Sequence, residues 1–371
     1  MAPKSIRGSL GSMFQFFFTL GVMTSYWIDY GVTQHMAATT SQWQVPIGLQ
    51  LVPGGLLGIG MLLTKESTRW LAKKGKTDEA LKSLIWVRGG ENNDAVQEEF
   101  AEILAGIHEE VRTTKGLTWK EALLPANRFR FVIVITLQIG VQLTGNTSLA
   151  YYAPQIFNAI GAGDQSLFIT GFFGVVKVVS CLFFLLFLVE RIGRRGSLLG
   201  GSFLMGTYML IIACLTATHP PVSGKGFTST GAAAVTMVYL EAMTYNISWG
   251  PVSWLYMGEI FPTRLREAGI AVGTATQWLF NFVFSQVTPY AINNIGWRTF
   301  LMFCIFNWSL VVYTWLFIKE TKGKSLEEME ALFGSTQTAI NIHAVRGKGY
   351  AEGDNAHHAS TRRSSQLEPG V

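Results

Sequence analysis

Side-chain amides recur inside the most apolar stretches of this 371-residue chain. Gln142 lies in one stretch and Asn246 in a second, while Gln277 and Asn281 lie in a third, four residues apart and so on one helix face. An amide both donates and accepts hydrogen bonds. Amides within apolar helices therefore either join neighbouring helices or line a cavity for a solute with many hydroxyl groups.

Aromatic and helix-breaking residues follow Asn246 within the same stretch. Trp249 and Trp254 flank a Gly-Pro pair, which interrupts a helix and leaves backbone groups in need of new partners. An indole offers an apolar face together with one N–H donor. An interrupted helix that carries an amide and two indoles is typical of the wall of a polar cavity.

Two charged residues, Lys177 and Glu241, also lie within apolar stretches, about ten and about nine residues from the same side of the membrane. At the helical rise, both side chains are about 14–15 Å deep. A charge at such depth is costly unless it has a partner. Two hypotheses follow: Lys177 forms an ion pair with Glu241, or it receives the carboxylate of a ligand.

Clusters of opposite charge stand at the ends of four apolar stretches. Such charges can close one side of a protein in one conformation and separate in another. The alternative is that they only mark one side of the membrane and form incidental salt bridges. The clusters are Lys65–Arg69, Glu190–Arg195, Glu259–Arg266 and Lys319–Gly323.

The composition indicates the elements that position these residues. Hydrophobic residues make up 49% of the chain and charged residues 14%, against about 25% charged residues in soluble domains. This excludes a disordered, collagen-like or disulfide-rich chain and favours an all-α polytopic membrane protein. Eight apolar runs are long enough to cross a bilayer as helices: 9–32, 43–64, 129–151, 167–189, 196–217, 232–257, 268–292 and 299–318.

The basic residues predict the orientation. Of the 29 Lys and Arg, all but Arg130, Lys177, Lys225 and Arg298 fall on one side when each run crosses once. That side is the cytoplasm, and both termini are expected there. The net charge of +5 therefore reflects topology and does not indicate nucleic-acid binding.

We expect four regions along the chain. Residues 1–64 form two membrane helices, and 65–128 form a cytoplasmic helical linker with an amphipathic helix over 95–111. Residues 129–320 form six membrane helices, and 321–371 form a mostly disordered cytoplasmic tail. The sequence contains no phosphate-binding loop, nucleophile elbow or zinc-ligand spacing. We therefore expect no enzyme activity, metal or cofactor.

The motifs together resemble the signature set of the sugar porter family, within the major facilitator superfamily. Arg7-Gly8 and Lys65–Arg69 resemble partial versions of two further family motifs, and the fungal quinate and hexose permeases are the most similar subfamilies. The motifs that carry the resemblance are Glu190-Arg-x-Gly-Arg-Arg195, Glu259-x6-Arg266, Lys319-Glu-Thr-Lys-Gly323 and Gln142-Leu-Thr-Gly145.

The resemblance implies a twelve-helix bundle, of which this chain supplies the counterparts of helices five to twelve as an N-terminally truncated member. It implies transport of a hexose or quinate-like compound by alternating access in the plasma membrane, with protons as a candidate coupling ion. Two alternatives stay open. The chain is a receptor that binds sugar without moving it, or it is an inactive fragment of a transporter.

The residues and the resemblance together give two candidate sets. Thr147 stands where many members carry Asn, with Asn146 beside it. The substrate-binding set is Gln15, Gln142, Asn146, Thr147, Lys177, Asn246, Trp254, Gln277 and Asn281. The set of ion pairs that changes with conformation is Arg7, Glu66, Arg69, Glu190, Arg194, Arg195, Glu259, Arg266 and Glu320.

Overall fold

The described part of the chain is built from helices and turns. A computed structural model describes residues 7–114, 119–161, 165–188, 191–220, 227–262, 264–324 and 326–333, and no strand occurs among them. This confirms the all-α class predicted from the composition. The tail over 335–371, for which we expect disorder, lies outside these residues.

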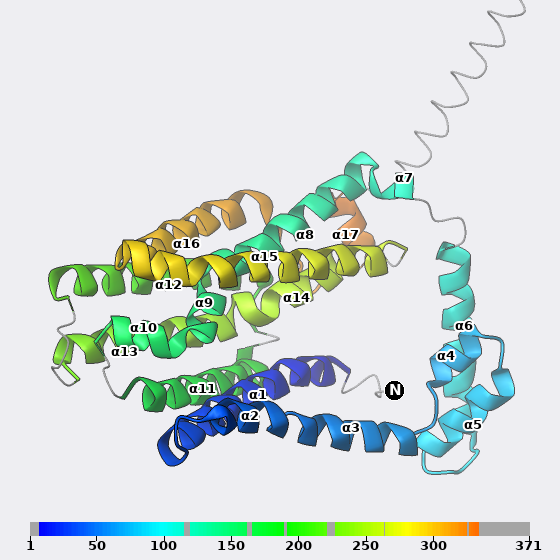
Figure 1. Ribbon diagram of the computed structural model, residues 1–371. Helices are drawn as coiled ribbons and strands as arrows, with labels where there is room; N and C mark the ends of the chain where they lie inside the picture. Colours follow the sequence, from blue (N-terminus) through cyan, green and yellow to red (C-terminus); the bar gives the residue numbers. More distant parts are fainter. Residues whose placement is uncertain are drawn as a thin grey trace, which may run out of the picture.

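Two long apolar segments begin the fold. Helix α1 (Arg7–His35) is followed by α2 (Thr40–Leu49), which packs back against it, and α3 (Leu51–Leu63) continues toward the linker (Figure 1). The return segment is interrupted at Gln50, between α2 and α3. These helices coincide with the runs predicted at 9–32 and 43–64.

Three short helices and the longer α6 form the linker beyond the ends of the bundle helices (Figure 1). The amphipathic α6 covers the stretch predicted at 95–111, and its apolar face packs against α4 and α5 in a small core that contains Leu84 and Phe100. The linker therefore has apolar packing of its own. Its helices are α4 (Thr68–Lys73), α5 (Thr77–Val87), α6 (Asp94–Thr114) and α7 (Trp119–Ala122).

The remaining helices form the larger bundle. In it α12 packs along both α13 and α16, and α8 packs along α15 (Figure 1). Its first members are α8 (Pro125–Leu143), α9 (Asn146–Tyr151), α10 (Ala153–Ala159), α11 (Ser166–Phe183) and the π-helix η2 (Phe184–Leu188). They are followed by α12 (Arg194–Thr218), α13 (Ser229–Ile247), α14 (Trp249–Glu259), α15 (Arg266–Ile295), α16 (Arg298–Phe317) and α17 (Leu326–Phe333).

Four segments of the described chain have both the length and the apolar composition needed to cross a membrane. The other four predicted runs fall on α1, α8 with α9, α13 with α14, and α15, whose longest helices have 19 to 30 residues but carry more polar residues. The count of eight membrane helices stays a prediction. The four segments are Thr40–Leu63, Ser166–Leu188, Arg194–Thr218 and Arg298–Phe317.

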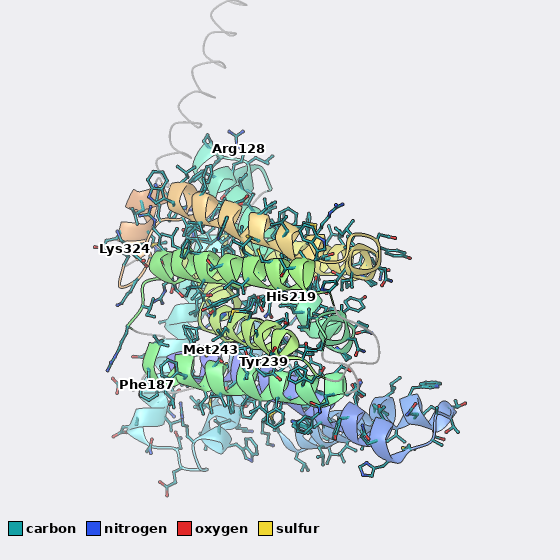
Figure 2. The ribbon with its side chains drawn as sticks, turned by 90° about the vertical axis from the view of Figure 1, so that its left-hand side faces the viewer. Arg128, Phe187, His219, Tyr239, Met243 and Lys324 are labelled. Carbon is teal, nitrogen blue, oxygen red and sulfur yellow. The ribbon has the colours of Figure 1, made fainter. Side chains whose placement is uncertain are left out.

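The outer surface of the bundle is apolar, as a lipid-facing surface must be. Phe187 on η2 and Met243 on α13 are both exposed, whereas Tyr239, one turn before Met243, is half-buried (Figure 2). Inside, one buried apolar cluster surrounds Trp249 and Tyr256, and a second surrounds Phe157 and Phe303. The described bundle thus places apolar residues both in its core and on its surface.

Helices α1 and α11 approach closely because α11 presents glycines at their contact. A Cβ on Gly171 would lie 2.9 Å from the Trp27 ring, and one on Gly174 would lie 2.8 Å from the Met23 Cα atom. Small residues at such positions let helix backbones come together in a membrane. Near this contact the Tyr26 hydroxyl donates a 2.6 Å hydrogen bond to the Ala150 carbonyl of α9.

Candidate functional site

The run predicted as one helix over 129–151 is interrupted between α8 and α9. Gly145 adopts φ of +88°, a conformation that L side chains rarely adopt, and a Cβ there would lie 2.9 Å from the Phe303 ring. The Asn307 amide donates a 3.0 Å hydrogen bond to the Thr144 carbonyl that the interruption frees. The interruption sets Gln142 and Asn146 on either side of a turn within the bundle.

A second interruption separates α13 from α14 at Ser248, next to the predicted Gly-Pro pair. Pro251 occupies the first turn of α14, where its missing N–H leaves no helical bond unmade. The buried Trp249 indole donates hydrogen bonds to the Ser202 hydroxyl at 2.7 Å and the Leu198 carbonyl at 3.1 Å on α12. These two hydrogen bonds hold the start of α14 against α12. Asn246 is buried just before the interruption.

Gln142 and Gln277 are brought together from α8 and α15. The Gln142 amide nitrogen donates a 3.4 Å hydrogen bond to the Gln277 backbone carbonyl. Both side-chain oxygens are buried without a hydrogen-bond partner. One turn along α15, Asn281 accepts a 3.4 Å hydrogen bond from the Tyr151 hydroxyl of α9.

Other amide oxygens of the bundle are in the same state. Those of Gln138 and Asn246 are also buried without a hydrogen-bond partner. An acceptor of this kind that finds no donor costs about 1–3 kcal/mol. A ligand with several hydroxyl groups supplies such donors. The side-chain oxygens of Gln138, Gln142, Asn246 and Gln277 are therefore acceptors available to such donors.

The remaining predicted substrate residues are only partly buried. Thr147 is half-buried on α9, and the Trp254 indole on α14 is 38% exposed. Gln15 is half-buried on α1, and no hydrogen bond in the described part of the chain joins it to Gln142 or Gln277. Gln138 belongs with the amide group but is absent from the predicted set, although its place one turn before Gln142 was a usable signal.

Lys177 and Glu241 are joined through an intervening amide. The Lys177 ammonium donates to the Asn146 side-chain oxygen at 3.2 Å, and the Asn146 amide nitrogen donates to Glu241 Oε2 at 3.1 Å. Lys177 also lies 5.2 Å above the Phe173 ring. The structure thus brings three residues from α9, α11 and α13 into one buried chain of hydrogen bonds.

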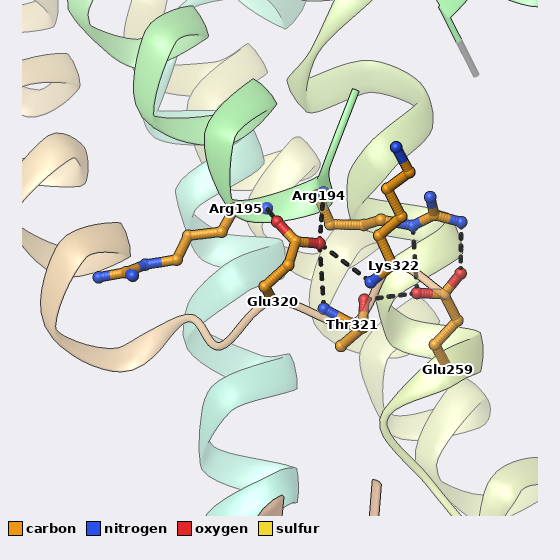
Figure 3. A network of polar contacts seen from close by, with 6 residues as sticks. All are labelled: Arg194, Arg195, Glu259, Glu320, Thr321 and Lys322. Carbon is orange, nitrogen blue, oxygen red and sulfur yellow. Dashed lines mark hydrogen bonds and ion pairs between the residues drawn. The ribbon is translucent and has the colours of Figure 1, made fainter. Parts of the chain in front are cut away.

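A network of polar contacts joins the ends of α12, α14 and α16 (Figure 3). Arg194 forms an ion pair with Glu259 at 2.8 Å, and the Thr321 hydroxyl donates to the same carboxylate at 2.6 Å. The Arg195 guanidinium donates to the Trp315 carbonyl at 2.7 Å. Three of the four predicted clusters therefore contribute to one site.

The Glu320 carboxylate is the most heavily bonded member of that network. It accepts hydrogen bonds from the backbone N–H groups of Arg194, Arg195, Thr321 and Lys322 at 2.8 to 3.1 Å (Figure 3). Burial raises the pKa of the Glu320 carboxyl, but the four donors lower it more, so that the pKa lies below its ordinary value. Glu320 therefore binds the first turn of α12 as an anion.

The other residues of the predicted ion-pair set lie elsewhere. Arg69 pairs with Glu110 inside the linker at 2.6 Å, and the Glu66 carboxylate accepts the neighbouring Ser67 N–H at 2.8 Å. The Arg266 Nε atom is buried without a hydrogen-bond partner. Glu190 and the side chain of Arg7 lie outside the described residues.

An ion pair absent from the predicted set joins the linker to the bundle. Arg264 and Glu121 of α7 form two parallel hydrogen bonds of 2.7 Å, and these raise the pKa of the Arg264 guanidinium. Arg264 stands between the two ends of the Glu259–Arg266 cluster. Its position was a usable signal, but the sequence does not reveal that Glu121, more than 140 residues earlier, is its partner.

Comparison with known proteins identifies the family. The family model described as "Sugar (and other) transporter" matches residues 1–333. The chain belongs to this family. It is 34% identical to a probable quinate permease of Aspergillus fumigatus and 35% identical to a quinate permease of Neurospora africana, each match covering 90% of this chain. The chain spans 64% of the length of each of these relatives.

Solved structures of the major facilitator superfamily share the fold of this sugar-transporter family member. The proton:xylose symporter XylE bound to 6-bromo-6-deoxy-D-glucose is 27% identical, with a TM-score of 0.67 over 90% of this chain and 68% of XylE. Its inward-open form gives a TM-score of 0.70 at 25% identity, over 89% of this chain and 66% of XylE. The predicted family and multi-pass helical architecture are confirmed.

Proposed function

We propose that this protein transports a sugar or a related polyhydroxy acid, hexose-like or quinate-like, by alternating access. The observation that carries the proposal is the group of buried amide oxygens without donors beside the two helix interruptions. The relatives named as quinate permeases, and XylE bound to a deoxy sugar, support this class of substrate.

In this proposal the substrate lies between the amides of α8, α13 and α15. Gln142, Asn246 and Gln277 accept hydrogen bonds from its hydroxyl groups, and Asn281 supplies a further amide. The partly exposed Trp254 covers an apolar face of the substrate ring. Gln15 and Thr147 complete the contacts from α1 and α9.

The polar network at the ends of α12, α14 and α16 is proposed to hold the cytoplasmic side closed while the substrate site opens outward. Arg194, Glu259 and Glu320 form its centre. Opening toward the cytoplasm then requires these contacts to separate. Arg195, which also bonds to Glu320, is proposed to act with them. The same role is proposed for the outlying residues Arg7, Glu66, Arg69, Glu190 and Arg266 when the opposing helices meet.

The proposed setting is the plasma membrane, with both termini in the cytoplasm and with protons as the coupling ion. The distribution of Lys and Arg supports the orientation. The structural similarity to XylE, a proton:xylose symporter, supports coupling to protons.

Uptake of radiolabelled quinate and D-glucose by yeast that lacks its own transporters tests the proposal. We expect the wild-type chain to accumulate at least one of the two, and Gln142→Ala to reduce uptake about tenfold, since a lost buried hydrogen bond removes roughly 1.4 kcal/mol. Gln97→Ala, an amide in the exposed face of α6, is the matched control and retains wild-type uptake. Uptake of neither solute by correctly inserted protein would contradict the function.

A further inference from the structure

Three polar side chains lie in contact in the bundle, each from a different helix. Lys177 is 5% exposed, Asn146 is 3% exposed and Glu241 is fully buried. Lys177 donates one hydrogen bond to Asn146, and its ammonium also lies 5.2 Å from the centre of the Phe173 ring. A lysine and a glutamate at this depth are stable only when their charges are compensated.

Some hydrogen-bond donors and acceptors of this group have no partner within the group. The Asn146 amide presents its oxygen to Lys177 and its nitrogen to Glu241, the orientation that an ammonium and a carboxylate together select. The ammonium carries three donors, and Asn146 takes one. Glu241 Oε1 is buried without a partner. A purely structural ion pair brings its charges into contact and fills these positions, whereas here an amide separates them.

The electrostatic surroundings of Glu241 are simple. From α11 the charged group that faces it is Lys177, from α9 the neutral amide of Asn146, and on its own helix the phenol of Tyr245. Within the described residues of α12 and α14, no charge acts on Glu241. Helix α1 also packs against α11, and its titratable groups Tyr26 and Asp29 do not act on Lys177.

We propose that Lys177, Asn146 and Glu241 form a proton-gated site for the carboxylate of a hydroxy acid. Without ligand, the positive and negative charges cancel across Asn146. A proton that reaches the site binds Glu241 Oε1 and makes this carboxyl neutral. The Lys177 ammonium then has no counter-charge, and the ligand carboxylate accepts its free N–H donors. One proton and one monoanion enter together, and the net charge of the site returns to zero.

The position of Asn146 connects this site to the proposed polyol site. Asn146 is the first residue of α9, directly after the interruption at Gly145, and Gln142 lies on the other side of that interruption. A cyclic acid with hydroxyl groups on its ring can therefore place its carboxylate at Lys177 and its hydroxyls at the amides. This inference rests on the proposed function and narrows its substrate to a monocarboxylate that enters with a proton.

Binding to the purified 371-residue chain in detergent tests the site without requiring transport. Quinate is the anionic probe and D-glucose the neutral one, titrated from about pH 5 to about pH 8. Quinate should bind more weakly as the pH rises, by up to about tenfold per pH unit. Glu241→Gln, which imitates the protonated carboxyl, should bind quinate tightly at every pH. Lys177→Met should lose quinate binding and retain D-glucose.

The matched control is Asp29→Asn, which removes another carboxyl from a long apolar helix and should leave the pH dependence of quinate binding unchanged. The wild-type protein alone gives an independent measurement, since about one proton should be taken up from a weakly buffered solution per quinate bound. This measurement decides the matter even where a variant fails to fold.

Several outcomes overturn the site. These are quinate binding without proton uptake, the same pH dependence in Glu241→Gln as in wild type, and an equal loss of quinate and D-glucose in a folded Lys177→Met protein. D-glucose binding without quinate binding also overturns it but leaves the proposed function standing. Binding of neither probe by folded wild-type protein overturns both.

Discussion

A single carboxylate, that of Glu320, ties the segment after α16 to the start of α12. It accepts four backbone N–H groups, two of which are the otherwise unpaired donors at the N-terminus of α12. Hydrogen bonds to a charged acceptor are stronger than those to a neutral one. The contact therefore depends on the ionised form of one residue and not on a particular arginine side chain.

Glu320→Gln should lower the stability of the protein by about 1 kcal/mol, a value reduced from that of a fully buried charged acceptor because Glu320 is half-buried. The pKa of the folded carboxyl lies below its ordinary value of 4.5. The contribution of the Glu320 carboxylate to folding stability is therefore complete above pH 4.5. It is lost as the pH falls through the lower pKa that this carboxyl has in the folded protein. The variant should lack this part of the acid dependence.

Thermal unfolding of the purified protein in detergent, measured at neutral pH and between about pH 3 and pH 5, checks this expectation. Glu98→Gln changes the same residue type at an exposed position of α6 and serves as the control. An unfolding temperature of Glu320→Gln equal to that of wild type at neutral pH would show that the four N–H groups find equivalent partners elsewhere.

The residue types predicted which positions form polar sites, but not which side chains form hydrogen bonds with one another. The amides of Gln142 and Gln277 and the buried charges of Lys177 and Glu241 stand out in the sequence because polar groups are rare in apolar runs. The role of Asn146 as the group between the two charges depends on how α9, α11 and α13 pack. Tertiary packing of this kind leaves no periodic signal in the sequence.

At the scale of elements, the linker helices α4, α5 and α6 share an apolar core separate from those of the bundle. Leu84 of α5 is 1% exposed at the centre of this core. The Arg88–Glu99 ion pair at 2.6 Å also lies within the linker and joins α5 to α6. The linker is therefore stabilised mainly by its own contacts.

Leu84→Ala should destabilise the linker by about 3 kcal/mol through the cavity it leaves. Because few contacts join this core to the bundle, the loss should be local. Hydrogen–deuterium exchange should accelerate in α4, α5 and α6 and stay unchanged in α12 and α16. Leu198→Ala in the bundle core is the matched control and should produce the opposite distribution. Faster exchange throughout the chain in Leu84→Ala would show that linker and bundle unfold together.

The apolar runs predicted where the long helices lie, but not where they are interrupted. The Gly-Pro pair indicated the second interruption, which falls at Ser248 just before it. The first interruption carries no proline, and it depends on the positive φ of Gly145 and on Asn307 from α16. The first interruption thus depends on a residue from a distant helix, and the sequence around Gly145 does not reveal that residue.

At the scale of the whole molecule, the distribution of basic residues predicts that the linker and both termini lie in the cytoplasm. This orientation can be tested with single cysteines in a background in which Cys181, Cys214 and Cys304 are replaced. In intact cells a membrane-impermeant maleimide should label Ser229→Cys, at the exposed start of α13, and leave Glu91→Cys of the linker unlabelled. Permeabilised cells should label both. The reverse pattern in intact cells would contradict the orientation.

The glycine contact between α1 and α11 has a mechanical consequence. Most packed helices interlock through side chains, so that one can slide past the other only when rotamers change. At Gly171 and Gly174 the side chain of Trp27 and the Met23 Cα atom lie close to the α11 backbone, and the Trp27 ring also contacts Phe168 and Phe172 of α11, with ring centroids at 6.0 and 5.5 Å. An axial shear of α1 along α11 would therefore require these rings to repack, and we expect the two helices to move together as one unit while their neighbours rearrange.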